Sequence, residues 1–148
     1  MMIFLGSDHR GFDLKNDIAM YLKSKNLQFL DEGNQHLNTR DDFPQFAARV
    51  VNQLLASNDL DPRGILICGS GQGMCMAANR FKGIRASLCS SIDQARSVRN
   101  DDDSNVLCLA ADEIDLNEAK RIIDVWLMTP FAAAPRYIRR LSELDQLG

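Results

Sequence analysis

The stretch that decides the fold is Gly64-Ile-Leu-Ile-Cys-Gly-Ser-Gly-Gln-Gly73, where an uninterrupted apolar run meets a cysteine and three alternating glycines. The run at 64–67 contains no polar side chain, which is typical of a strand covered on both faces of a parallel sheet. Helix-forming residues follow at 74–79, so residues 68–73 are predicted to form a strand-to-helix turn. Backbone N–H groups in such a turn, with a helix dipole behind them, attract an anion.

Cys68 lies where this strand enters the turn. The electropositive surroundings of such a turn stabilise a thiolate, and Gly69, Gly71 and Gly73 leave the backbone open to close approach by a ligand. A buried structural thiol is the alternative interpretation. The place of Cys68 between an apolar strand and a glycine-rich turn favours function, because it sets a potential base beside a preformed anion site.

Composition limits the classes of protein. A chain of 148 residues is predicted to form one domain, 1–148. A formal net charge of −3 argues against a nucleic-acid-binding surface. No signal-peptide core or membrane-spanning run is present. The four cysteines show no paired-ligand spacing, so we expect a reduced, cytoplasmic protein without structural zinc; they are Cys68, Cys75, Cys89 and Cys108.

Hydrophobic periodicity predicts alternating strands and helices. Strands are expected at 2–5, 27–30, 64–67, 83–89 and 105–110, and helices after Gly11 and at 43–55, 74–79, 91–99, 116–127 and 132–147. The second helix carries a core-facing stripe, made of Phe43, Phe46, Ala47, Val50, Val51, Leu54 and Leu55. This alternation predicts an α/β fold, a five-stranded parallel sheet with helices on both faces.

Ligands in such folds bind beyond the carboxyl ends of the strands. Those ends supply Asp8-His9, residues 68–73, Cys89-Ser90 and residues 110–112, so several chemistry-bearing segments converge on one rim. A histidine there can titrate near neutral pH. Asp8 can alternatively cap the following helix in a solvated turn.

Two further motifs have competing interpretations. Arg136 and Arg140 are spaced to share one face of the last helix, where they can clamp a phosphate or form a solvated basic face. The glycine-rich turn lacks the dinucleotide spacing because Met74 occupies the final glycine position, and no Gly-Lys-Ser/Thr follows it. Nucleotide binding is therefore disfavoured.

Five segments together resemble the type B ribose-5-phosphate isomerases and the related galactose-6-phosphate isomerase subunits. They are Asp8-His9, Asp42-Phe43-Pro44, the Cys68–Gly73 block, Ala77-Ala78-Asn79-Arg80 and Gly83-Ile84-Arg85-Ala86. The resemblance implies a Rossmann-like αβα sandwich and a homodimer or dimer of dimers with active sites shared between subunits. It also implies isomerisation of a sugar phosphate without metal or organic cofactor.

The resemblance implies roles for individual residues. Cys68 is the base that moves a proton between C2 and C1 of the open sugar, and the loop amides of Gly69, Gly71 and Gly73 hold the developing oxyanion. Ser70 stands beside the reacting oxygens, next to Gln72. Asp8 and His9 contact the substrate hydroxyls or phosphate, and Arg136 and Arg140 bind the phosphate.

The chain also departs from the family pattern. Asp101 and Asp102 fall where the family has a ring-opening histidine and a substrate-binding asparagine, and Asp112 falls where many members have a phosphate-binding arginine. Phe43 replaces a common tyrosine. A carboxylate donates a proton poorly at neutral pH unless its pKa is raised, as mutual repulsion within the 101–103 cluster can do. Asp112 in place of arginine puts negative charge near a dianionic group.

Three hypotheses follow from this pattern of matches and departures. The first is a sugar-phosphate isomerase of the ribose 5-phosphate type that works through a cis-enediolate. The second is an isomerase for a different or less anionic sugar. The third is a non-catalytic sugar-phosphate-binding domain or partner subunit.

Overall fold

The apolar run at residues 64–67 lies at the centre of a five-stranded, all-parallel sheet in the computed structural model, which describes residues 1–148. This central strand is β3 (Arg63–Cys68), and the strand order is β2-β1-β3-β5-β4. The other strands are β1 (Ile3–Ser7), β2 (Phe29–Asp31), β4 (Ala86–Leu88) and β5 (Val106–Ala110). The predicted parallel sheet of five strands is confirmed.

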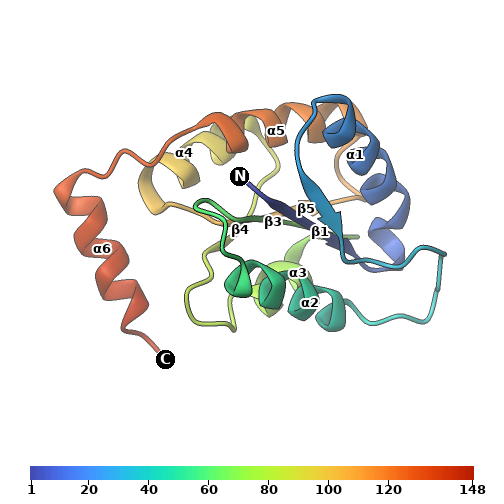
Figure 1. The fold of residues 1–148 in the computed structure, drawn as a ribbon, viewed down its shortest axis with the longest axis horizontal. Helices are drawn as coiled ribbons and strands as arrows, with labels where there is room; N and C mark the ends of the chain where they lie inside the picture. Colours follow the sequence, from blue (N-terminus) through green and yellow to red (C-terminus); the bar gives the residue numbers. More distant parts are fainter.

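Helices cover both faces of the sheet (Figure 1). One face packs on α1 (Phe12–Ser24), α4 (Ile92–Asp102) and α5 (Leu116–Met128), and the other on α2 (Phe43–Ala56) and α3 (Gln72–Ala78). Two apolar cores result, one on each side of the sheet. The architecture is the predicted Rossmann-like αβα sandwich.

Alternate side chains of β3 enter opposite cores, as the two-residue period of a strand requires. Ile65 and Ile67 lie in the core beneath α1 and α5, whereas Leu66 and Cys68 lie in the core beneath α2 and α3. Every residue of β3 is buried. Cys68 is therefore fixed by its strand at the point where the chain leaves the sheet.

The stripe on α2 is buried only in part. Phe46, Val50 and Val51 lie in the core, but Phe43 is 36% exposed and Leu55 is 48% exposed. Phe43 occupies the first turn of the helix, where its ring contacts the backbone of Gly73 instead of the core. The prediction that these two end residues face the core was wrong.

Several element boundaries differ from expectation. Strand β4 begins at Ala86 because the chain turns at residues 82–83 and is irregular at 84–85, and the Asn79 side chain bonds both the N–H and the carbonyl of Ala86. Helix α4 continues to Asp102. Helix α6 (Pro135–Asp145) begins later than predicted, buries no residue and lies at one side of the sandwich beside α4 (Figure 1).

None of the helices combines the length and the apolar character that crossing a membrane requires.

Replacing Trp126 with alanine is expected to destabilise the fold by about 3–5 kcal/mol. The indole is fully buried, donates from Nε1 to Ser104 Oγ at 3.3 Å and lies 5.2 Å from the Arg63 guanidinium. Urea unfolding at fixed protein concentration measures the change. Met128→Ala, at an 82% exposed position of the same helix, is the control and should stay within about 0.5 kcal/mol; equal losses in both variants would contradict the prediction.

Candidate active site

Three loops meet at the carboxyl edge of the sheet, the edge where the parallel strands end. Ser7 pairs with Ile67 and Cys68 with Ala110 in the strand register, so the segments that follow β1, β3 and β5 emerge side by side. The Ala111 N–H donates to the Cys68 carbonyl at 2.9 Å. The predicted convergence of Asp8-His9, residues 68–73 and residues 110–112 on one rim is confirmed.

The glycine loop (residues 68–73) directs a backbone amide at the cysteine. Gly71 N–H donates to Cys68 Sγ at 3.1 Å, and the thiol side chain is buried, with 5% of the residue exposed. Gly71 has φ +72°, and a Cβ there would lie 2.4 Å from the Leu88 side chain. Only glycine fits this position, so a larger residue would displace the amide that contacts the sulfur.

Two side chains of the glycine loop are open to solvent. Ser70 and Gln72 are exposed, and Ser70 Oγ accepts a hydrogen bond from Gln72 N–H at 3.3 Å. A Cβ on Gly73 would lie 3.0 Å from the Phe43 ring. The loop therefore presents small polar groups beside the aromatic ring of Phe43.

Arg10 covers the other end of the glycine loop. A Cβ on Gly69 would lie 2.5 Å from Arg10 Cζ, so this glycine makes room for the guanidinium. Arg10 also forms an ion pair with Asp112, and both side chains are about half exposed. The negative charge expected from Asp112 is thus matched by a cation that the sequence interpretation did not identify.

Asp8 caps the 3₁₀ turn (His9–Gly11) that follows β1. Its carboxylate accepts hydrogen bonds from the N–H groups of Arg10 and Gly11 at 3.0 and 3.1 Å, and the residue is 7% exposed. This is the capping role that the sequence left open. The cap fixes the turn that carries His9.

His9 is held by a residue distant in sequence. Its backbone N–H and its Nδ1 lie 2.9 and 2.8 Å from Asp41 Oδ1, and the Asp41 side chain is only 6% exposed. Sequence reasoning missed Asp41, which lies in a polar loop with no periodic signal. Its neighbour Asp42, part of the recognised Asp-Phe-Pro segment, makes no side-chain cap hydrogen bond.

Asp101 and Asp102 lie away from the glycine loop. They belong to the last turn of α4, which leads to the amino end of β5 and therefore to the opposite edge of the sheet. The expectation that the acidic segment lies on the carboxyl rim was wrong for a single chain. Asp103 is structural: with φ +47° it ends the helix and pairs with Arg99 and Arg85 at 2.9 and 3.0 Å.

Arg136 and Arg140 lie on the side of the molecule that carries Asp101 and Asp102, away from Cys68. Burial raises the pKa of Asp102 above its ordinary value, the Asp101 carboxylate adds to the rise, and Arg140 opposes it. Arg136 lies over the Tyr137 ring at 4.4 Å and donates to its hydroxyl. The structure thus brings together two groups of predicted site residues, one around Cys68 and one where α4 meets α6.

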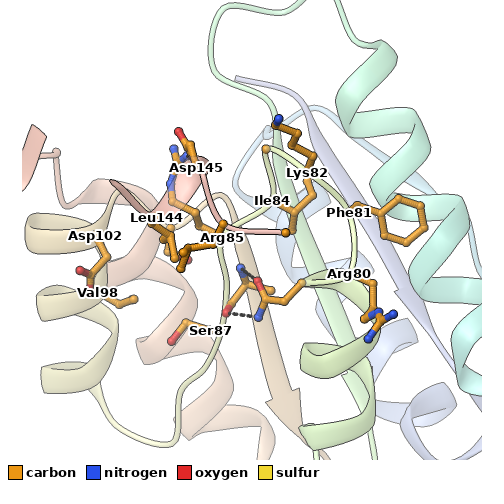
Figure 2. Close-up of a pocket in the computed structure, with 16 residues that line it drawn as sticks. Arg80, Phe81, Lys82, Ile84, Arg85, Ser87, Val98, Asp102, Leu144 and Asp145 are labelled. Carbon is orange, nitrogen blue, oxygen red and sulfur yellow. Dashed lines mark hydrogen bonds and ion pairs between the residues drawn. The ribbon is translucent and has the colours of Figure 1, made fainter. Parts of the chain in front are cut away.

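A cavity of about 810 Å³ adjoins the second group. It lies between residues 79–87, α4 and the end of the chain, and Leu144 and Asp145 of α6 line it together with Arg85, which pairs with Asp145 at 3.8 Å (Figure 2). Asp102 is the one predicted site residue that lines it. The glycine loop lies on an open surface outside this cavity.

The other three cysteine thiols differ in the direction in which their surroundings shift the pKa. The Cys108 thiol, hydrogen-bonded to Cys75, lowers the pKa of Cys75 to about 7. That same hydrogen bond and complete burial raise the pKa of Cys108, and burial raises that of Cys89. No group of three or more His, Cys, Asp or Glu side chains is arranged to hold a metal ion.

This geometry defines the class of protein. A cysteine sulfur that accepts an amide hydrogen bond, a carboxylate-held imidazole on the adjacent loop and the exposed side chains of Ser70 and Gln72 suit proton transfer on a small polar substrate. Their location at the carboxyl edge of a parallel sheet is where enzymes of this architecture bind ligands. The class is an α/β enzyme of acid–base chemistry.

Comparison with known proteins leads to the same class of enzyme. The model of the Ribose/Galactose Isomerase family matches residues 3–144. A probable ribose-5-phosphate isomerase B of Mycoplasma genitalium is 39% identical over 142 residues, covering 96% of this chain and 92% of that protein. The Escherichia coli ribose-5-phosphate isomerase B is 40% identical over 125 residues, covering 84% and 82%.

Solved structures that resemble this chain are also ribose 5-phosphate isomerases. The ribose 5-phosphate isomerase of Thermotoga maritima aligns with a TM-score of 0.93 at 39% identity and covers 99% of this chain and 98% of its own. The Mycoplasma genitalium enzyme with bound ribulose 5-phosphate aligns with a TM-score of 0.91 at 38% identity, covering 98% and 94%. The chain belongs to the ribose/galactose isomerase family and is an aldose–ketose isomerase of that family.

Alkylation should distinguish the thiols. Because Cys108 lowers the pKa of Cys75 to about 7, reaction of Cys75 with iodoacetamide should rise with pH through a midpoint near that value, while Cys108 and Cys89 stay unmodified. Tandem mass spectrometry reads each site separately. In the Cys108→Ala variant the Cys75 midpoint should move up toward the ordinary thiol value; an unchanged midpoint would refute the assigned cause.

Proposed function

We propose that the protein interconverts ribose 5-phosphate and ribulose 5-phosphate through a cis-enediolate, with Cys68 as the base. The observation that carries the proposal is the hydrogen bond from Gly71 N–H to Cys68 Sγ on an open loop. It is supported by the resemblance of the chain to a Mycoplasma genitalium enzyme whose structure holds ribulose 5-phosphate.

The proton-transfer step uses groups of the glycine loop. The Cys68 thiolate removes the proton from C2 of the open aldose, the C1 carbonyl becomes an enediolate oxygen, and the thiol returns the proton to C1. Amides of Gly69, Gly71 and Gly73 stabilise the developing negative charge. The exposed side chains of Ser70 and Gln72 contact the sugar oxygens.

We propose that a second copy of the chain supplies the other end of the site. Asp101 and Asp102 lie at the opposite sheet edge from Cys68, and a strand of five or six residues is about 17–20 Å long. A five-carbon sugar phosphate cannot span that length. Arg136 and Arg140 of one copy would therefore bind the phosphate of the substrate held at Cys68 of the other.

Helix α6 supports such an assembly as a homodimer or dimer of dimers. It buries no residue within its own chain. Ile138, Leu144 and Leu147 are 52%, 48% and 74% exposed at this end of the chain. Covering these side chains with a second copy would release apolar surface from water and carry the arginine pair to its partner's glycine loop.

The charge balance at the rim favours a phosphorylated sugar over a less anionic one. Asp112 does not stand alone near the glycine loop, because it pairs with Arg10. An incoming phosphate can take over the guanidinium of Arg10. We place the enzyme in the cytoplasm, an assignment supported by its four free thiols.

Proton NMR in D₂O tests the reaction. The unmodified protein given ribose 5-phosphate should form ribulose 5-phosphate that carries deuterium at C1, and Cys68→Ala should slow this by about 100-fold or more. Cys89→Ala, which removes a buried thiol from the opposite core, is the matched control and should stay active. Absence of both exchange and ketose in the unmodified protein would reject the proposal.

Mixing two inactive variants tests the shared site. Cys68→Ala and Arg136→Ala chains should each be inactive alone, but a re-equilibrated mixture should recover about a quarter of the unmodified activity, because half of the dimers are mixed and each holds one intact site. Mixing Cys68→Ala with Cys68→Ser is the control and should recover nothing. Failure of the first mixture to recover activity, with dimers exchanging normally, would show that each site belongs to one chain.

A further inference from the structure

A network of partly buried hydrogen bonds runs from α1 to His9. Lys15 Nζ, fully buried, donates to Asp31 Oδ2 at 2.7 Å and to the Asn34 carbonyl at 3.0 Å. The Asn34 side-chain amide then donates to Asp41 Oδ2 at 3.2 Å, and Asp41 Oδ1 accepts from His9. Residues of α1 and of the 31–41 segment are thus organised around one imidazole.

This network holds Asp41 rigidly as an acceptor. One carboxylate oxygen takes the His9 backbone N–H and Nδ1, and the other takes Asn34. Burying a lysine and a carboxylate in this way is costly unless each is bonded. The network therefore fixes the geometry of His9 and carries a desolvation cost that an ordinary solvated turn would not require.

The contact with Asp41 selects the tautomer of His9. Because a carboxylate only accepts hydrogen bonds, Nδ1 carries the proton and Nε2 is left as the ring nitrogen available to substrate. His9 is 30% exposed on its side chain, whereas Asp41 is 6% exposed. The arrangement is a buried carboxylate behind a partly open imidazole, which holds the ring in one orientation while Nε2 takes up and returns a proton.

His9 stands beside the glycine loop. Ser7 pairs with Ile67 in adjacent strands, so His9 and Cys68 follow neighbouring strand ends. The 3₁₀ turn of His9 packs directly on β3, since a Cβ on Gly11 would lie 2.6 Å from the Ile67 carbonyl oxygen. A sugar held at Cys68 is therefore next to the imidazole.

We propose that His9, positioned by Asp41, is the acid–base catalyst that opens the sugar ring, an inference that rests on the proposed function. Nε2 accepts the proton of the C1 hydroxyl while the C1 carbonyl forms and the bond from C1 to the ring oxygen breaks. The imidazolium then returns that proton to the ring oxygen. His9 ends unchanged, and the open aldehyde passes to Cys68.

The positions of the two residues favour His9 over Asp101 for ring opening. Asp101 lies at the opposite edge of the sheet and bonds the side-chain amide of Asn100 at 2.8 Å. It reaches the sugar only from a second copy. His9 and Cys68 lie on adjacent loops of one chain, so ring opening and proton transfer can proceed on one bound substrate.

The test separates ring opening from enolisation. Ribulose 5-phosphate has its C5 hydroxyl esterified and is open-chain, so exchange of its C1 hydrogen in D₂O needs Cys68 but no ring opening. At saturating substrate, His9→Gln should slow conversion of ribose 5-phosphate by about 100-fold or more while C1 exchange of ribulose 5-phosphate stays near the unmodified rate. Asp41→Asn should show the same selective loss, and the exposed neighbour substitution Asp42→Asn should show none.

Each other outcome overturns the proposal. Equal slowing of both reactions would make His9 a binding group, no slowing would remove it from the mechanism, and a selective loss in Asp101→Asn alone would move ring opening to that residue. If the unmodified protein neither isomerises nor exchanges, the proposed function itself fails.

Nitrogen NMR tests the positioning role without turnover. At pH 8 the ring nitrogens of His9 should report the Nδ1-protonated tautomer, and Asp41→Asn should shift the balance toward the Nε2-protonated form. The chain has only two histidines, so His36→Gln assigns the spectrum. An Nε2-protonated His9 in the unmodified protein would refute the role of Asp41.

Discussion

The structure depends on close backbone contact where three loops meet above the sheet. A Cβ on Gly11 would lie 2.6 Å from the Ile67 carbonyl oxygen, and a Cβ on Gly71 would lie 2.4 Å from the Leu88 side chain and 3.1 Å from the Leu109 backbone. These contacts bring the loops after β1, β3 and β5 within reach of one substrate. The amide that contacts Cys68 and the turn that carries His9 both follow from this packing, which ties the fold directly to the chemistry.

Ionisable side chains at the rim are arranged in pairs. Arg10 pairs with Asp112, His9 with Asp41 and Lys15 with Asp31. The buried pairs organise the scaffold, since breaking a buried pair leaves an uncompensated charge. The exposed pair differs, because both of its members are about half exposed and an exposed ion pair contributes little stability. Arg10 is therefore the cation on the rim that can exchange its partner for a phosphate at small cost.

The sequence predicted the central elements well and the boundaries near the second group of site residues poorly. Continuous apolar runs specify β3 and β5 because both faces of each strand are buried. Helix α4 was expected to end near Arg99 but continues to Asp102, although acidic residues in the last turn of a helix oppose its dipole. A hydrogen bond from Ala132 N–H to the Asn100 carbonyl favours the extra turn, and the charge of Arg140 favours the Asp102 carboxylate. Likewise, no local signal marks Asp41, whose role arises only when the 31–42 loop folds over the first turn.

In the proposed mechanism, the two groups of site residues divide the work of catalysis. The groups proposed to transfer protons, Cys68 and His9, lie on adjacent loops of one chain, where rigid strand ends fix their separation. The groups proposed for anion recognition, Arg136 and Arg140, lie on a helix that buries none of its residues in its own chain. Precise geometry matters most for proton transfer, whereas a charge contact tolerates looser placement. Assembly of two chains would then govern how tightly a sugar phosphate binds, while the chemistry of ring opening and enolisation stays within each chain.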